Sequence, residues 1–149
     1  MTITEKEGFL TVSADKASPY VAHIRAGGQQ MTIDESGLVK GEQKVGPDPY
    51  DFILSALGSC TVITLHMYAQ RKGWPLERAE VSLWHERVHP TDCDNCDQKD
   101  AKLSLVTKRL RLTGDLTPEQ RVRLESVSSK CPVQKTLETG ISITTILEV

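Results

Sequence analysis

The chain has 149 residues, of which 38% are hydrophobic and 26% charged, and its formal net charge is −2. This length suits a soluble domain with a sizeable core, and the near-neutral charge excludes the basic footprint of a nucleic-acid-binding protein. Four cysteines are too few for a disulfide-stapled secreted scaffold. The start, MTITEKEGFL, lacks a secretory signal pattern, and no apolar run approaches the roughly 20 residues of a membrane helix. We therefore expect a cytoplasmic protein with neither a membrane nor a nucleic-acid partner.

The first half of the chain predicts short strands followed by one long helix. The strand-like stretches are residues 8–13, 20–25 and a third strand that begins at 31 and breaks at 35–37. A long helix is expected from Pro49 to Lys72, because Pro49 suits a first helical turn and Asp51 complements the positive end of the helix dipole. Gly73 then ends this helix.

The second half predicts more strands and two further helices. Strands are expected over residues 79–89, 101–112 and 141–149. Thr117 suits an N-cap, with Pro118 in the first helical position and Gln120 completing a capping box, and this helix should end near Lys130. A short helix is expected from Pro132. Hairpin-connected strands combined with separate helices indicate an α+β fold.

Cys60 lies in the middle of the expected long helix, in the stretch GSCTVITL. Residues at offsets of three, four and seven share its helix face, namely Ile53, Ala56, Leu57, Ile63, Thr64 and Met67. This pattern is typical of a core stripe, and free cysteine is among the most buried residue types. Periodicity therefore favours a packing role for Cys60 and leaves a redox role open.

Cys131 lies at the junction of the last two expected helices, in the stretch KCPVQKTL. As N-cap of the second helix, its sulfur would face unpaired backbone N–H groups, and Lys130 adds a nearby positive charge. Both effects favour a thiolate. The alternative is a junction residue whose environment is set by the turn at Pro132. A disulfide with Cys60 requires the two Cα atoms to lie within about 7 Å, which spacing alone does not decide.

The other two cysteines, Cys93 and Cys96, follow two histidines in the segment HERVHPTDCDNC. His85, His89, Cys93 and Cys96 are ligand types that zinc prefers. On one extended strand, however, His85 and His89 would lie about 13 Å apart, which is too far for one ion. A metal site at His89, Cys93 and Cys96 and a reversible surface disulfide are the minor alternatives, and no special role is the main expectation. We expect no cofactor.

Three segments of the chain have the order and spacing of motifs from one known family. They are GPDPYDFILSALGSCTVITLHMYAQRKGWPLE, VSLWHERVHPTDCDNC and GDLTPEQRVRLESVSSKCPVQKTLE. Together they resemble the OsmC/Ohr family (osmotically inducible protein C and organic hydroperoxide resistance), in its general OsmC-like branch. The resemblance extends over roughly residues 20–149. It implies one OsmC-like domain over residues 1–149, with antiparallel sheets wrapped around central helices in an intertwined homodimer.

The resemblance also implies a thiol-dependent peroxidase that reduces organic hydroperoxides. By this carry-over, Cys60 is the nucleophile that attacks the peroxide, and Cys131 is the resolving cysteine. A dithiol such as dihydrolipoamide would regenerate the enzyme. Relatives use an arginine and a glutamate beside the nucleophile. Arg25 is the candidate for the arginine, and Asp51 is the candidate acid because Tyr50 occupies the glutamate position.

A second function is compatible with the same residues. A non-catalytic dimer of this fold could act in the stress response or bind an apolar ligand, with Cys60 as a core residue. The missing glutamate, and Gln134 where many relatives have a histidine, favour this alternative. The retained pair of cysteines favours the peroxidase. A Cys60–Cys131 disulfide formed under mild peroxide would separate the two.

Overall fold

A computed structural model describes residues 10–37, 46–88 and 103–148 of the chain. These residues fall into two compact units, with the boundary between Ile53 and Leu54. Each unit is described by itself. The α+β class expected from the sequence is confirmed, because antiparallel sheets occur with separate helices. That the chain forms one domain stays a prediction.

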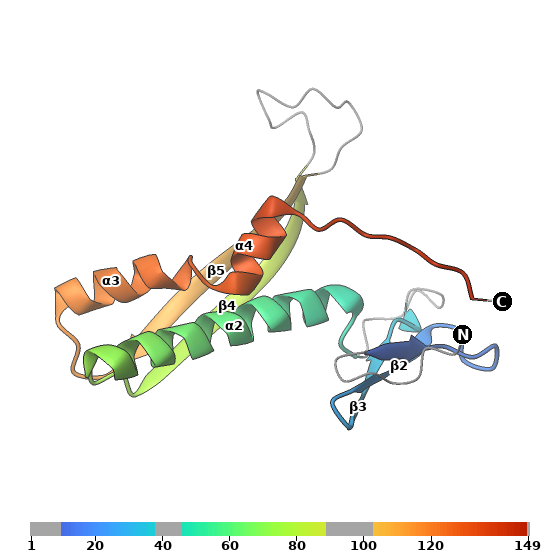
Figure 1. The fold of residues 1–149 in the computed structure, drawn as a ribbon, viewed down its shortest axis with the longest axis horizontal. Coiled ribbons are helices and arrows are strands. Elements are labelled where there is room, and N and C mark those ends of the chain that lie inside the picture. Colours follow the sequence, from blue (N-terminus) through green and yellow to red (C-terminus); the bar gives the residue numbers. More distant parts are fainter. Residues whose placement is uncertain (1–9, 38–45, 89–102, 149) are drawn as a thin grey trace. The chain divides into compact units, whose positions relative to one another are not determined.

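The N-terminal unit is built on a three-stranded antiparallel sheet in the order β1–β2–β3 (Figure 1). The strands are β1 (Thr11–Ser13), β2 (Val21–Ala26) and β3 (Gln29–Asp34). Gly27 and Gly28 form the turn between β2 and β3 with φ of 54° and 75°, a conformation that glycine adopts without strain. Ile24 is buried, whereas its neighbours on the opposite face of the sheet, His23 and Arg25, are exposed.

The long helix α2 (Pro49–Lys72) begins and ends as the sequence predicts. Its first turn carries a reciprocal cap: the backbone N–H of Asp51 donates to the Asp48 carboxylate at 2.9 Å, and the N–H of Asp48 donates to the Asp51 carboxylate at 2.9 Å. These bonds satisfy donors that a helix start leaves without partners. Gly73, with φ of 67°, ends the helix in the left-handed conformation typical of a C-terminal cap.

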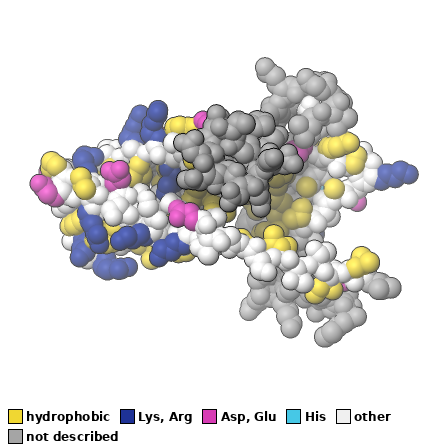
Figure 2. Space-filling model, turned by 90° about the horizontal axis from the view of Figure 1, so that it is seen from above, with side chains coloured by type: hydrophobic (Ala, Val, Ile, Leu, Met, Phe, Trp, Pro, Cys, Tyr) yellow, Lys and Arg dark blue, Asp and Glu magenta, His cyan; other side chains and the backbone are white. Residues whose placement is uncertain are grey.

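The C-terminal unit packs helices on a two-stranded antiparallel sheet. Figure 1 shows α2 running alongside the ribbon of β4 (Arg78–Val88) and β5 (Leu103–Thr113), with α3 (Pro118–Ser128) and α4 (Pro132–Thr139) following in the chain. Figure 2 shows Lys and Arg side chains gathered over the end of this unit that carries α3. The core that joins these elements consists of Leu65, Ala69, Leu116, Leu124 and Val127. Full burial of a leucine contributes about 1.5–3 kcal/mol, so Leu65 and Leu124, both 0% exposed, anchor α2 and α3 to each other.

The buried face of α2 differs from the stripe expected around Cys60. The residues it buries are Leu57, Gly58, Thr61, Leu65 and Ala69. Ile53, Ile63 and Met67 are 42%, 57% and 58% exposed, so the prediction that their face forms the core is wrong. The helix is apolar on more than one face, and Gly58 decides which face meets the sheet, since a Cβ there would lie 2.9 Å from Leu83.

The prediction of a strand at the C-terminus is also wrong. Residues 141–148 form no strand and leave α4 as an extended segment (Figure 1). Three of its apolar side chains are almost fully exposed: Ile143 at 84%, Ile146 at 79% and Leu147 at 88%. The sequence has strand-like composition here, but a strand requires a neighbouring strand to satisfy its backbone groups. Within the described chain, this segment has no such neighbour.

The other element boundaries agree with the sequence within a few residues, and both predicted helix starts are confirmed. Thr117 caps α3 through a full capping box with Gln120. Among the described residues, α2 alone is long and apolar enough, by length and composition, to cross a membrane, and 28% of its most apolar window is buried inside the protein. The core helix of a globular protein meets the same criterion.

Candidate functional site

Cys131 caps the N-terminus of α4, as its sequence context predicts. Its Sγ accepts a hydrogen bond from the backbone N–H of Gln134 at 3.4 Å, and its side chain is 0% exposed. Pro132 occupies the first helical position, where a missing N–H costs nothing. The sulfur therefore lies inside the protein at the N-terminal end of α4, where the helix dipole is positive.

Thr61 links Cys131 to the helix that carries Cys60. Thr61 follows Cys60 directly on α2 and is 0% exposed. Its Oγ1 donates to the carbonyl of Leu57 at 2.8 Å and lies 3.7 Å from the Sγ of Cys131. A threonine hydroxyl has one proton to donate. While Thr61 donates it to the Leu57 carbonyl, the contact with Cys131 requires the thiol of Cys131 to be the donor and the Thr61 oxygen to be the acceptor. Cys60 itself is a free thiol of intermediate exposure.

Lys108 reaches the same place from β5. Its Nζ donates to the Oγ1 of Thr61 at 3.2 Å and to the backbone carbonyl of Ser128 at 2.9 Å. Ser128 is the last residue of α3, where carbonyls have no partner within the helix and the dipole is negative. Thus one lysine joins the sheet, the end of α3 and the hydroxyl beside Cys131.

The pKa of Lys108 reports on its neighbours. Burial lowers this pKa from its ordinary value of 10.5, because desolvation disfavours the charged ammonium. Negative charge on Cys131, on Cys60 and on Glu138 acts in the opposite direction and raises it. The structure places Cys131 against Thr61, which follows Cys60 on α2 and accepts a hydrogen bond from Lys108.

Gln134 and Glu138 form the outer edge of this site on α4. The side-chain amide of Gln134 donates to the Glu138 carboxylate at 2.6 Å, one helical turn away. The Oε1 of Gln134 is buried and has no hydrogen-bond partner among the described residues. This is the position at which many relatives carry a histidine, and here the amide instead holds a carboxylate near Lys108.

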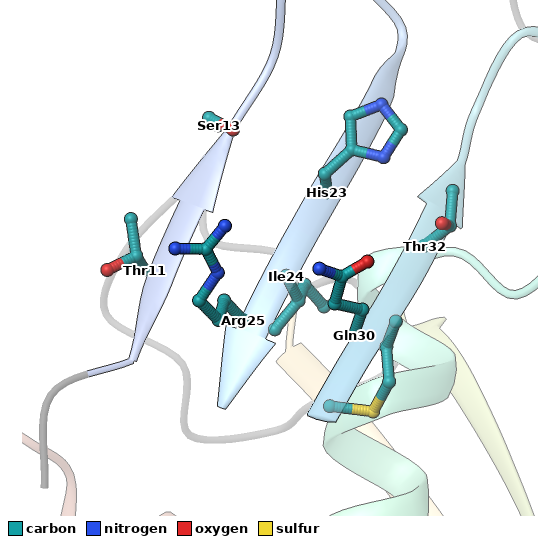
Figure 3. A pocket seen from close by; sticks show the side chains of 8 residues that line it. Thr11, Ser13, His23, Ile24, Arg25, Gln30 and Thr32 are labelled. Carbon is teal, nitrogen blue, oxygen red and sulfur yellow. The ribbon is translucent and has the colours of Figure 1, made fainter. Parts of the chain in front are cut away.

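Arg25 and Asp51, the other candidate catalytic residues, belong to the N-terminal unit. Arg25 lies opposite Thr11 of β1 and Gln30 of β3. Figure 3 shows the guanidinium of Arg25, the amide of Gln30 and the ring of His23 on one side of the sheet, where they line a hollow of about 610 Å³. Asp51 takes part in the cap of α2. Their roles in catalysis stay predictions.

The candidate metal ligands His89, Cys93 and Cys96 lie outside the described residues. His85 lies on β4 and is partly buried, next to Val106 of β5 in the strand register. In the part of the chain that the structure describes, no three His, Cys, Asp or Glu side chains gather in a group that could hold a metal ion.

Sequence reasoning missed Lys108 and Thr61. Alternation along β5 could have predicted that Lys108 faces the helices. Lys108 pairs with Leu83 on β4, and cross-strand partners share a face of the sheet. The side chain of Leu83 approaches Gly58 of α2, so this face is the one that meets the helix. A lysine on the helix-facing side of a strand needs a polar partner inside. Thr61 gave no comparable signal, because a threonine in a helix is ordinary.

Comparison with known proteins places this arrangement in a family. The family model of OsmC-like proteins matches residues 41–146, a range that contains both cysteine motifs. The chain belongs to the OsmC-like protein family. This confirms the family indicated by the three sequence motifs. No curated protein matches the chain by sequence.

Solved structures of OsmC-like proteins share the fold. An OsmC-like protein from Mycoplasma pneumoniae has a TM-score of 0.68 at 17% identity, with 91% of this chain and 89% of that chain covered. The organic hydroperoxide resistance protein OhrB of Bacillus subtilis has a TM-score of 0.59 at 16% identity, covering 85% and 87%. An organic hydroperoxide resistance protein OsmC from Legionella pneumophila has a TM-score of 0.60 at 12% identity, covering 85% of each chain. At these identities, the similarity shows the OsmC-like fold alone.

Proposed function

We propose that this OsmC-like protein is a thiol-dependent peroxidase that reduces organic hydroperoxides with Cys60 and Cys131. One observation carries the proposal: Thr61, which follows Cys60 directly on α2, has its Oγ1 3.7 Å from the Sγ of Cys131, so the helix that carries one cysteine contacts the other. The membership in the OsmC-like family and the structural neighbours named for hydroperoxide resistance support the substrate class.

The reaction needs two thiols and no bound cofactor. The Cys60 thiolate attacks the outer oxygen of the hydroperoxide, the O–O bond breaks, and the departing alkoxide takes a proton to become the alcohol. Cys60 is then a sulfenic acid. The Cys131 thiolate attacks that sulfur, forms the disulfide and releases hydroxide, which is protonated to water. An external dithiol such as dihydrolipoamide reduces the disulfide by exchange and leaves as its own disulfide.

Exposure supports these two roles. Cys60 is the more accessible sulfur and can meet a peroxide, whereas Cys131 is fully buried and is shielded from direct oxidation. A buried thiol at a helix N-terminus is suited to attack a sulfenic acid presented by its neighbour. In the full proposal, Arg25 and Asp51 assist the nucleophile, and the protein acts in the cytoplasm as an intertwined homodimer.

The assay compares single-cysteine variants. Reduced wild-type protein should consume cumene hydroperoxide in the presence of a dithiol, and Cys60→Ser should abolish turnover. Cys131→Ser should permit a first turnover and then accumulate the sulfinic acid of Cys60, detected by mass spectrometry. The double variant Cys93→Ser/Cys96→Ser is the matched control and should keep full activity. No peroxide consumption by fully reduced wild-type protein would exclude this function.

A non-catalytic OsmC-like dimer in the stress response, which could bind an apolar ligand, is the second candidate. The exposed apolar residues Ile63 and Met67 on α2 favour it, because they offer a surface for apolar contacts. Peptide mapping after one equivalent of hydroperoxide separates the candidates. A Cys60–Cys131 disulfide supports the peroxidase, and unchanged thiols support the binding protein.

A further inference from the structure

Lys108 is the one basic side chain in the described C-terminal unit whose hydrogen bonds reach the surroundings of Cys131. We propose that Lys108 is a positioning residue for Cys131: its ammonium, held by Thr61 and the Ser128 carbonyl, places positive charge next to the hydroxyl that contacts Cys131 and favours the thiolate form of that cysteine. This inference rests on the proposed function, because it assigns the cation that a thiol peroxidase needs. The family resemblance assigns Arg25 as the cation beside Cys60, and Lys108 would be a further cation, beside Cys131.

The hydrogen bonds fix where the charge lies. Two acceptors, the Oγ1 of Thr61 at 3.2 Å and the carbonyl of Ser128 at 2.9 Å, hold the Nζ between β5 and the end of α3. Leu83, the cross-strand partner of Lys108, packs toward Gly58 of α2, so the lysine lies on the face of the sheet that meets the helix. A lysine held on both sides loses little further freedom when a thiolate forms.

The network also supplies donors to a thiolate. When Cys131 loses its proton, the sulfur keeps the N–H of Gln134 at 3.4 Å and can accept the Thr61 hydroxyl if that group turns from the Leu57 carbonyl. Lys108 already donates to the Thr61 oxygen, which strengthens that hydroxyl as a donor. Lys108 therefore acts on Cys131 through Thr61.

Other titratable groups face Lys108 and bear on the pH dependence of the site. They are Cys60 on α2, Cys131 at the junction of α3 and α4, Glu138 on α4, and His85, which is adjacent to Lys108 on the same face of the sheet. Negative charge on Cys131, on Cys60 and on Glu138 favours the charged form of Lys108. The structural alternative is that Lys108 only caps the C-terminal end of α3, in which case thiol reactivity would not depend on its charge.

Alkylation kinetics test the inference without peroxide, so they can fail independently of the proposed function. Reduced protein is treated with iodoacetamide between pH 6 and about 11, and the modification of Cys60 and Cys131 is followed separately by mass spectrometry. Lys108→Met should slow the alkylation of Cys131 about tenfold at pH 7 and that of Cys60 less, because the thiolate is the form that alkylates and the variant has no ammonium to favour it. The difference should vanish at high pH, where the thiols ionise without help.

Three variants serve as controls. Lys108→Arg keeps the charge and should stay within about twofold of the wild type. Lys130→Met removes the exposed lysine that precedes Cys131 in sequence, and should also stay within about twofold. Thr61→Val keeps the shape but removes the hydroxyl, and it should slow Cys131 more than Cys60. If Lys108→Met does not fold, Thr61→Val still tests the inference, because it interrupts the contact between Lys108 and Cys131.

Two results would overturn the inference. Equal rates for Lys108→Met and wild type at pH 7 would show that the charge does not reach the thiols. Faster alkylation at every pH would show that the substitution loosens the packing around Cys131, which is the signature of a purely structural lysine. If Lys130→Met gave the tenfold loss instead, the charge would have to be assigned to Lys130.

Discussion

Polar residues enclosed between α2, β5 and α3 distinguish this core from an ordinary apolar contact. Thr61 is 0% exposed and Ser128 is 6% exposed, yet both hold hydrogen bonds with Lys108. An ammonium in such a place loses hydration and recovers part of it from its acceptors. The cost appears as the lowered pKa of Lys108, and it can be measured as a dependence of stability on pH.

The sign of that dependence follows from the direction of the shift. Burial lowers the pKa of Lys108 below 10.5, so between the folded value and 10.5 the unfolded chain binds more protons. The free energy of unfolding should therefore rise as the pH rises through this window. In a Cys60→Ser/Cys131→Ser background, where these two thiols do not titrate, the rise should be present with Lys108 and absent in Lys108→Met. Denaturant unfolding at a series of pH values measures it, and identical profiles would contradict it.

At the scale of elements, local sequence determined the helix starts. The start of α3 has the residues that a capping box requires, with Thr117 as N-cap, Pro118 in the first turn and Gln120 as its partner. The start of α4 is similar, because Cys131 is the N-cap, its sulfur accepts the hydrogen bond, and Pro132 follows. These features could be predicted because all their partners lie within four residues. They fix where α3 and α4 begin, and so they place Cys131.

The cap of α3 can be tested alone. Thr117→Ala removes the side chain that accepts from the Gln120 N–H at 3.1 Å, and should lower the free energy of unfolding by about 1 kcal/mol. Ser126→Ala, an exposed serine within the same helix, is the control and should change stability by less than about 0.5 kcal/mol. Chemical denaturation compares the two. An equal effect of both substitutions would mean that helix propensity, not the cap, accounts for the loss.

What the sequence did not predict depends on contacts distant along the chain. The face of α2 that meets the sheet was misassigned because the helix is apolar on several sides, and the close approach at Gly58 decides between them only in three dimensions. Lys108 was missed because the alternating pattern predicts that β5 is a strand but does not predict that the inner face of this strand lies near Cys131, the N-cap of α4. The contact of Cys131 with Thr61, and of Thr61 with Lys108, likewise could be known only from the fold.

At the scale of the whole molecule, two apolar surfaces remain uncovered in the single chain. The first is the outer face of α2 with Ile63 and Met67, and the second is the segment of residues 141–148. We propose that another chain covers them, because a strand-like segment needs a strand partner and an apolar helix face is stabilised by burial. An intertwined homodimer would supply both a neighbouring strand and a facing helix.

The C-terminal segment gives a sharp test of that dimer. If it pairs as a strand, alternate side chains face opposite sides, so Ile141 and Ile143 are buried together while Ser142 and Thr144 face outward. Ile143→Asp should then raise the dimer dissociation constant about tenfold to a hundredfold, since burying an isoleucine contributes about 1.5–3 kcal/mol. Thr144→Asp adds the same charge one residue later and should leave the constant almost unchanged. Sedimentation equilibrium measures both. A monomeric wild-type protein, or equal weakening by the two substitutions, would mean that the segment does not pair as a strand across a dimer.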